Sequence, residues 1–448
     1  MQQFLKYCME VFTIGGYSEV GKNMTAIKVG DEIIIIDMGL YLPKLLSYEE
    51  GDPRALSTNE LINLGVIPND SVLEKESNKV KAIVLGHCHL DHIGAVPYLA
   101  KRYDCPLIGT PYTIEILKTL YDDKKLKPKN RLKILHANTS IKVSNNFTIE
   151  FINITHSTLQ VVLVAIHTPE GVVLYGNDFK FDNYPVLGKR PNYETLKRLG
   201  DRGVKLLILD SLNSRIDMKT PSEKVARELL KDVILGTSNR GNAIIVTTFS
   251  SHISRLKSII DFGKKMNRKI VFLGRSLHKY VTAAEKLNLI NFSKDVEICG
   301  YRRLVQKRLK EISKNREKYL IVCTGNQGEP DATLSRMVRG ELPFEFKPGD
   351  EVIFSCRTIP TTETMRNREI LEKRLKQKSA RIFTNIHTSG HASREDHRDL
   401  INLTRPEHLI PAHGDFDMTS GLLSLATEMG YKPDKTVHLM HDGSTLKI

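Results

Sequence analysis

Short apolar runs separated by turn residues fill the first part of the chain. Residues 9–16, 23–30 and 32–37 each have the length and β-branched content of a strand. Gly30-Asp31 lies between the last two runs and predicts a hairpin, because this pair suits a tight turn. A helical pattern covers residues 112–123. Further strand-like runs occupy residues 81–86, 105–110, 147–154, 161–167 and 171–176, so the pattern predicts an α/β fold.

Strands and helices begin to alternate at residue 204. This alternation predicts βαβ units and a mostly parallel sheet, hence a second domain. From residue 379 the chain returns to strands that end in histidines. A site shared by both ends of the chain would make the middle an insertion. We therefore predict one domain from residues 1–209 and 366–448, and an inserted domain at 210–365.

The bulk composition excludes several classes of protein. The chain has 448 residues, 40% of them hydrophobic and 26% charged, as in large soluble globular proteins. No apolar run approaches the ~20 residues of a membrane span, and the first residues lack the pattern of a signal peptide. The six cysteines are scattered without a C-x-x-C pair. These features predict a cytoplasmic protein with reduced thiols and no membrane association.

The charge balance favours a polyanionic partner. Lysine and arginine number 66 against 52 acidic residues, which gives a net charge of +14. Two segments concentrate this charge, at 124–133 and 301–320. Each segment alone is equally consistent with an ordinary solvated surface.

The stretch GHCHLDH combines histidines and an aspartate at one turn. His87 and His89 are two residues apart at a strand end, so both side chains point the same way and can share one metal ion. Asp91 and His92 follow as the chain turns into a helical pattern and can face a second ion. Imidazole suits zinc, and an added carboxylate suits a two-metal site with centres about 3.5–4 Å apart.

Two zinc ions need more ligands than these four. His156, Asp178 and His413 each follow an apolar run, the context in which open sheets gather their sites. The sequence thus predicts two Zn²⁺ per chain. Sites that contain carboxylates also accept Mn²⁺ or Mg²⁺, which leaves the metal used in turnover open.

In order and spacing these residues resemble the motifs of the metallo-β-lactamase superfamily, which implies an αββα sandwich. By that resemblance His87, His89 and His156 would hold one zinc ion, and Asp91, His92 and His413 the other. Asp178 would bridge the two ions. Asp37, in IIIIDMG, would orient the ligand loop from outside the metal sphere.

The second half resembles the β-CASP nucleases, whose α/β domain is inserted in the sandwich and covers the catalytic cleft. The matching motifs are LDSLNS with Asp210, SGHAS with His391 and PAHGD with His413. TTFSSHISR, LGRSL and CTGNQGEPDATLSRM are similar to the ribonuclease J family in its short archaeal form. This resemblance implies single-stranded RNA as the substrate, 5′-to-3′ removal of nucleotides and a homodimer.

The resemblance also implies a pocket for a 5′-monophosphate. Hydroxyls and backbone N–H groups suit a phosphate, and arginine adds a fixed fork of charge. The residues carried over are His387, Ser389, Gly390 and His391, with Ser250, Arg275 and Ser276. At Ser276 a capping role at a strand-to-helix turn is an equal alternative.

For catalysis the expected nucleophile is a zinc-bound hydroxide. Asp91 or Asp178 would accept or orient its proton, and His391 would protonate the leaving oxygen. Three alternatives remain open: a β-CASP RNA endonuclease, a small-molecule hydrolase with the same metal core, and an RNA-binding scaffold without nuclease activity. The inserted domain and the SGHAS motif argue against the small-molecule hydrolase.

Overall fold

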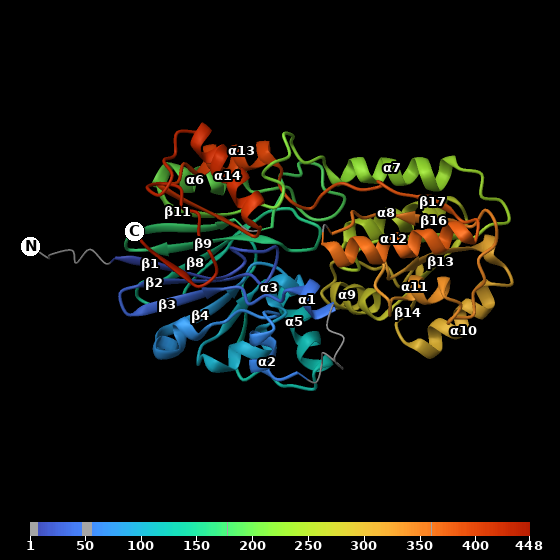
Figure 1. Ribbon diagram of the computed structural model, residues 1–448, viewed down its shortest axis with the longest axis horizontal. Helices are drawn as coiled ribbons and strands as arrows, with labels where there is room; N and C mark the ends of the chain where they lie inside the picture. Colours follow the sequence, from blue (N-terminus) through green and yellow to red (C-terminus); the bar gives the residue numbers. More distant parts are fainter. Residues whose placement is uncertain (1–7, 47–55, 177, 360) are drawn as a thin grey trace, which may run out of the picture. The chain divides into compact units, whose positions relative to one another are not determined.

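The computed structural model of this chain, which describes residues 8–46, 56–176, 178–359 and 361–448, divides into two compact units (Figure 1). The first unit comprises Met1–Asn183, Lys189–Thr220 and Gly390–Ile448. The second comprises Tyr184–Gly188 and Pro221–Ser389. None of the described helices has the length and apolar character needed to cross a bilayer.

The first unit contains two mixed sheets. The seven-stranded sheet has the order β19-β1-β2-β3-β4-β5-β6, and the six-stranded sheet has the order β18-β11-β10-β9-β8-β7. The strands of the first sheet are β1 (Met9–Gly15), β2 (Met24–Val29), β3 (Glu32–Ile36), β4 (Val80–Leu85), β5 (Leu107–Gly109), β6 (Leu132–Ile134) and β19 (Ser444–Lys447). Those of the second are β7 (Ser140–Lys142), β8 (Thr148–Asn153), β9 (Val162–Thr168), β10 (Gly171–Gly176), β11 (Val204–Asp210) and β18 (His408–Ala412).

The two sheets of this unit pack face to face and carry helices on their outer faces (Figure 1). One core cluster joins Ile34 and Val84 of the first sheet to Val164 and Ile208 of the second. A second cluster packs the outer face of the six-stranded sheet against α6 (Tyr193–Arg202), α13 (Arg394–Thr404) and α14 (Phe416–Glu428). On the other side α5 (Pro111–Asp123) packs on β5 and β6. The predicted αββα sandwich is confirmed.

Local sequence explains these elements. β3 is a continuous buried isoleucine run because it lies between β2 and β4 inside the sandwich. The predicted hairpin at Gly30-Asp31 joins antiparallel β2 and β3, with Gly30 at φ 59°. Thr110 caps α5 by accepting a hydrogen bond from the Thr113 N–H, and Pro111 occupies its first turn.

Strand pairing positions the predicted ligands. β10, β11 and β18 run parallel to one another, so their carboxyl ends meet at one edge of the six-stranded sheet. Asp178, Asp210 and His413 lie at or just beyond these ends. In the facing sheet β3 and β4 are also parallel, which brings Asp37 beside Gly86 and the histidine-rich turn.

The second unit holds one six-stranded sheet of the order β14-β13-β15-β12-β16-β17, and every pairing in it is parallel. The strands are β12 (Ile244–Thr247), β13 (Lys269–Leu273), β14 (Val296–Cys299), β15 (Tyr319–Cys323), β16 (Glu351–Phe354) and β17 (Arg381–Phe383). The helices are α7 (Glu223–Gly236), α8 (Ile253–Lys265), α9 (Arg275–Lys286), α10 (Arg302–Ile312), α11 (Thr333–Val338) and α12 (Thr362–Gln377). The expected parallel α/β domain is confirmed.

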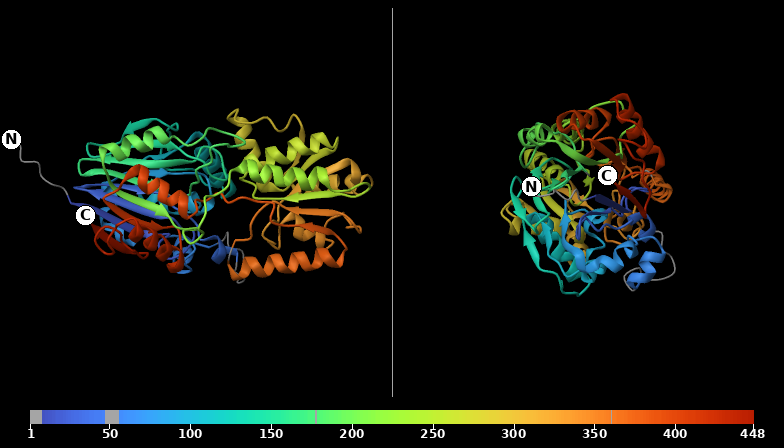
Figure 2. Two further views of the ribbon diagram at one scale, coloured as in Figure 1. Left: turned by 90° about the horizontal axis from the view of Figure 1, so that it is seen from above. Right: turned by 90° about the vertical axis from the view of Figure 1, so that its left-hand side faces the viewer.

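Short helices complete the chain. They are α1 (Leu42–Leu46), α2 (Thr58–Asn63), α3 (Leu90–Ile93) and α4 (Val96–Leu99), with the 3₁₀ segments Ser71–Lys79, Ala100–Arg102 and Arg316–Lys318. Figure 2 shows the same elements from two further sides.

The boundaries of the compact units differ from those expected from sequence. A boundary at 365/366 would cut α12, and β17 beyond it pairs with β16 in the parallel sheet. We therefore place the end of the insertion at Ser389, where the compact unit ends.

Arg255 anchors the second unit from within. This side chain on α8 is fully buried. Its Nε and Nη2 donate to the two carboxylate oxygens of Glu223 at 2.5 and 2.9 Å, and its Nη1 donates to the Ser355 carbonyl at 2.7 Å. Burial alone would raise the pKa of Glu223, but the charges of His252 and Arg255 hold it well below the ordinary value. The pair thus joins α7, α8 and the end of β16.

Substituting Arg255→Met should destabilise the second unit by about 3–5 kcal/mol, because Glu223 would remain buried without the charge and hydrogen bonds of Arg255. Urea denaturation followed by circular dichroism would measure the loss. Lys231→Met is the matched control, since Lys231 pairs with Glu228 on the exposed face of α7. An Arg255→Met protein as stable as this control would contradict the prediction.

Candidate metal centre

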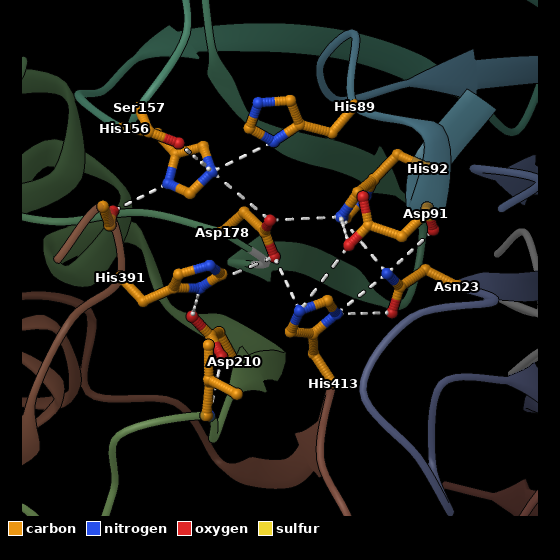
Figure 3. Close-up of polar contacts among 12 residues, drawn as sticks. Asn23, His89, Asp91, His92, His156, Ser157, Asp178, Asp210, His391 and His413 are labelled. Atoms are coloured by element: carbon orange, nitrogen blue, oxygen red, sulfur yellow. Dashed lines mark hydrogen bonds and ion pairs between the residues drawn. The ribbon is translucent and has the colours of Figure 1, made fainter. Parts of the chain in front are cut away.

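The predicted ligands converge on one point of the first unit (Figure 3). Two groups of side chains have ligand atoms within 4.8 Å of one another. The first group is His87, His89, His156 and Asp178, and the second is Asp91, His92 and His413. A third, overlapping group joins Asp178 and His413 to His391.

Asp178 lies between the two main groups. Its Oδ2 is 3.4 Å from His87 Nε2, 3.3 Å from His92 Nε2 and 3.5 Å from His156 Nε2. Its Oδ1 is 3.5 Å from His413 Nε2. This buried Oδ1 accepts no hydrogen bond from any part of the chain that the structure describes. A carboxylate in this position can contact cations on either side.

Contacts behind the rings set their tautomers. His92 Nδ1–H donates to Asp37 Oδ2 at 2.7 Å, and His156 Nδ1–H donates to the Gly390 carbonyl at 2.7 Å. His413 Nδ1–H donates to Asn23 Oδ1 at 3.0 Å. In each ring the Nε2 lone pair consequently faces the centre, which is the arrangement that metal ligation requires.

The donor atoms are too crowded to be satisfied by one another. His89 Nδ1 lies 3.0 Å from His87 Nε2 and 3.3 Å from His156 Nε2. Three imidazole nitrogens and a carboxylate oxygen at such spacing suit a divalent cation, and the nitrogen-rich set suits zinc. The residues therefore fit a metal centre.

Electrostatics agree with this donor set. Burial, reinforced by His87, lowers the pKa of His89 to about 3, and burial with His391 lowers the pKa of His156 well below its ordinary value. Burial opposes ionisation of Asp178 as well, yet the facing rings of His413 and His92 hold its pKa well below the usual range. Burial thus favours neutral His89 and His156 beside an ionised Asp178, the protonation states of ligands. Burial alone would lower the pKa of His92 as well, but the carboxylates of Asp178 and Asp37 raise it well above its ordinary value.

Three residues of the centre adopt left-handed backbone. Asp37, Asp178 and His413 have φ of 60°, 49° and 55°. Non-glycine residues rarely occupy this region, and such conformations gather at functional sites. Each of these residues lies one or two positions after the end of a buried strand. There the chain turns sharply, which directs the side chain toward the centre.

His391 lies beside both groups and is oriented by Asp210. Its Nδ1–H donates to Asp210 Oδ2 at 2.9 Å, and its ring stacks on His413 with centroids 5.6 Å apart. Burial alone would lower the pKa of His391, but the carboxylates of Asp178 and Asp210 outweigh it and raise the pKa to about 9. The raised pKa favours a charged ring that can donate a proton.

Sequence reasoning missed Asn23. Its Oδ1 accepts from His413 Nδ1–H, and its Nδ2 donates to the Asp91 carbonyl at 3.0 Å, so Asn23 links the final histidine to the HxHxDH turn. It precedes β2 in the N-terminal meander and belongs to no motif. Only its position in space identifies it.

The residues expected to bind phosphate divide between the units. Gly390 and His391 belong to the first unit, where Gly390 supports His156. A Cβ on Gly390 would lie 2.9 Å from Ser157 Cβ and 3.0 Å from His156 Nδ1, which explains the glycine. The others lie beyond carboxyl ends of the parallel sheet in the second unit; they are Ser250, Arg275, Ser276, His387 and Ser389. Their joint pocket remains a prediction.

Three family models match the chain. The model of the metallo-beta-lactamase superfamily matches residues 18–219, and that of the ribonuclease J beta-CASP domain matches residues 241–372. The model of a Zn-dependent metallo-hydrolase RNA specificity domain matches residues 377–439. These matches agree with the sandwich and its inserted domain.

Relatives match over nearly the whole chain. Ribonuclease J of Methanocaldococcus jannaschii is 48% identical over 98% of this chain and 99% of its own length. Ribonuclease J of Pyrococcus abyssi is 44% identical over 98% of this chain and 97% of its own. Ribonuclease J of Helicobacter pylori is 33% identical over 99% of this chain and 61% of its own.

A solved structure shares the fold. The crystal structure of a protein of unknown function from Enterococcus faecalis superposes with a TM-score of 0.66 at 18% identity, covering 99% of this chain and 100% of that one. At this identity the likeness shows the fold alone.

If Asp91, His92 and His413 hold a metal ion as predicted, substituting Asn23→Ala should weaken its binding by about ten- to a hundredfold, since the change removes the contact that orients His413. Competition with a chromogenic chelator would measure the affinity. The control is Asn192→Ala, which removes the cap of α6 away from the centre. Equal affinities in both variants would show that Asn23 does not orient the ligand.

Proposed function

Because the chain belongs to the ribonuclease J family, it is a metal-dependent ribonuclease, and we propose that it is a 5′-to-3′ exoribonuclease that favours a 5′-monophosphate on single-stranded RNA. The observation that carries this proposal is the position of His391. Its ring lies against ligands of both metal groups, with centroids 4.8 Å from His156 and 5.6 Å from His413.

The cofactor that we propose is a pair of zinc ions. His87, His89 and His156 would hold one, Asp91, His92 and His413 the other, and Asp178 both. When bound, two such ions lower the pKa of water and neutralise charge on a phosphodiester. Mn²⁺ or Mg²⁺ in the same residues stays open, because the set includes carboxylates.

The chain's own residues then provide proton transfer and alignment. Asp91, with 29% of its side chain exposed, is the ligand best placed to accept a proton from water, and Asp178 can share this role. His391 donates its proton to the leaving oxygen. Asp210 is fully buried and fixes the ring by its hydrogen bond to Nδ1, which leaves Nε2–H as the donor.

The segment from His387 to His391 supports the choice of a 5′ end. Gly390 contacts the metal ligand His156 through its carbonyl, and His391 follows it directly. A phosphate bound by the hydroxyl and N–H groups of this segment would lie at a fixed number of bonds from the centre. Ser250, Arg275 and Ser276 belong to the second unit and keep the phosphate-binding role that the family resemblance implies. This arrangement would remove nucleotides one by one from the 5′ end.

Two further features belong to the proposal. The family likeness supports a homodimer. All six cysteines are free thiols, which supports a reducing compartment such as the cytoplasm.

Wild-type protein should release labelled mononucleotide first from a 5′-labelled single-stranded RNA, faster from a 5′-monophosphate than from a 5′-triphosphate. His391→Ala should lower this rate about 10²–10⁴-fold, the usual contribution of a general acid. Gel analysis of products, with metal content measured for each protein, tests both points. His136→Ala is the control, because His136 is exposed and outside the metal groups. Internal fragments appearing first, whatever the 5′ group, would mean an endonuclease instead.

Substituting Asp210→Asn should move the alkaline limb of the pH–rate profile to lower pH. His391 must be protonated to act, and its raised pKa means that the active form is lost as pH rises through about 9. Removing Asp210 removes one of the two carboxylates that stabilise the charged ring, so the loss should begin at lower pH. An alkaline limb that does not move would exclude His391 as the proton donor.

A further inference from the structure

Two helices of the second unit begin side by side at the carboxyl edge of its sheet. β13 and β14 are parallel neighbours, with Leu273 opposite Cys299. The Gly274 N–H donates to the Cys299 carbonyl at 3.1 Å, so the starts of α9 and α10 are held together. The two helices carry no acidic residue in their first turns.

An aromatic pair, of which Tyr301 is exposed and His278 is half-buried, lies at this edge. Tyr301, at the start of α10, is 63% exposed, and its ring centroid is 5.7 Å from that of His278 on α9. A Cβ on Gly300 would lie 2.7 Å from His278 Cβ, so the glycine permits this close packing. Leu304, one turn along α10, is 47% exposed. The pair offers a supported aromatic surface to solvent.

Exposed cations follow Tyr301 along α10. Arg302, Arg303, Lys307 and Lys310 are exposed on α10, and none of them forms an ion pair within the part of the chain that the structure describes. Among the described basic residues of α10, Arg308 forms ion pairs, with the carboxylates of Glu297 and Glu311. Glu297 and Glu311 are therefore already paired with Arg308. The positive charges of the other four side chains are available to a partner.

We propose that this surface, formed by Tyr301, His278, Arg302, Arg303 and Lys307, is a stacking platform for single-stranded RNA. A base stacks on the tyrosine ring and the flanking cations contact phosphates, the combination typical of proteins that bind single strands without sequence preference. The proposal rests on the proposed function, because it assigns a contact for the same substrate. It gives the basic segment 301–320 a role.

The positive charge of this surface favours RNA over a second copy of the chain as its binding partner. A two-fold contact would place the same patch against itself and bring the cations of two α10 helices together. RNA carries a negative charge at each nucleotide, which complements the patch. Arg275, one of the residues expected to bind phosphate, begins α9 at this same edge of the sheet, so an RNA strand on the platform would already be near a phosphate contact.

Binding of a fluorescent oligoadenylate of about 20 nucleotides, with phosphorothioate linkages to slow cleavage, tests the platform on the full chain. Tyr301→Ala should weaken binding about tenfold, whereas Tyr301→Phe, which keeps the ring, should bind like wild type. Arg302→Ala/Arg303→Ala should reduce the slope of log affinity against log salt by about 1.4, because each single-strand phosphate contact contributes about 0.7.

Lys373→Ala/Lys376→Ala on α12 is the matched control, since both lysines are exposed and the net charge changes equally. An equal change of slope in this control would overturn the platform in favour of diffuse attraction. Wild-type affinity for RNA in Tyr301→Ala would also overturn the platform. If sedimentation of this variant then showed altered self-association, the surface would be a protein contact instead. Hydrolysis of unmodified RNA by the wild-type preparation reports separately on the proposed function.

Discussion

Lone pairs on neighbouring imidazoles repel one another unless a cation lies between them, and the centre of this chain depends on that constraint. His87, His89 and His156 bring ring nitrogens to within 3.0–3.3 Å. The arrangement persists because each supporting contact lies on the far side of its ring: the Asp37 carboxylate behind His92, the Gly390 carbonyl behind His156 and Asn23 behind His413. The sandwich brings these supports together by running strands in parallel so that their ends share an edge.

The same edge explains how a chain can be interrupted and still build one site. β11 ends at Asp210, and β18, which pairs with it directly, leads to His413. The second unit occupies most of the sequence between these two strands. The pairing of β11 with β18 requires only that the chain after the insertion returns to the edge of β11. The insertion can therefore form its own sheet without disturbing the metal groups. Arg255 and Glu223 stabilise that sheet internally, independently of the centre.

Local patterns predicted the parts of this structure that depend on local chemistry. The spacing of His87, His89, Asp91 and His92 sufficed to predict that these side chains gather as candidate metal ligands, and Gly30-Asp31 sufficed to predict a hairpin. Asn23 could not be found in this way, because it meets His413 across 390 positions of sequence. The end of the insertion was equally hidden, since the apolar run of β17 does not say which sheet it joins. Ring tautomers, too, become apparent only when the carbonyl of Gly390 is seen behind His156.

The left-handed backbone at Asp37, Asp178 and His413 has a consequence for the evolution of this chain. Glycine would adopt these angles without strain, so each position is one at which a random change could stabilise the fold. Such a change would also delete a side chain on which the metal groups depend. Selection for thermal resistance alone would therefore push the chain towards an inert sandwich, and only selection for catalysis keeps these three positions strained.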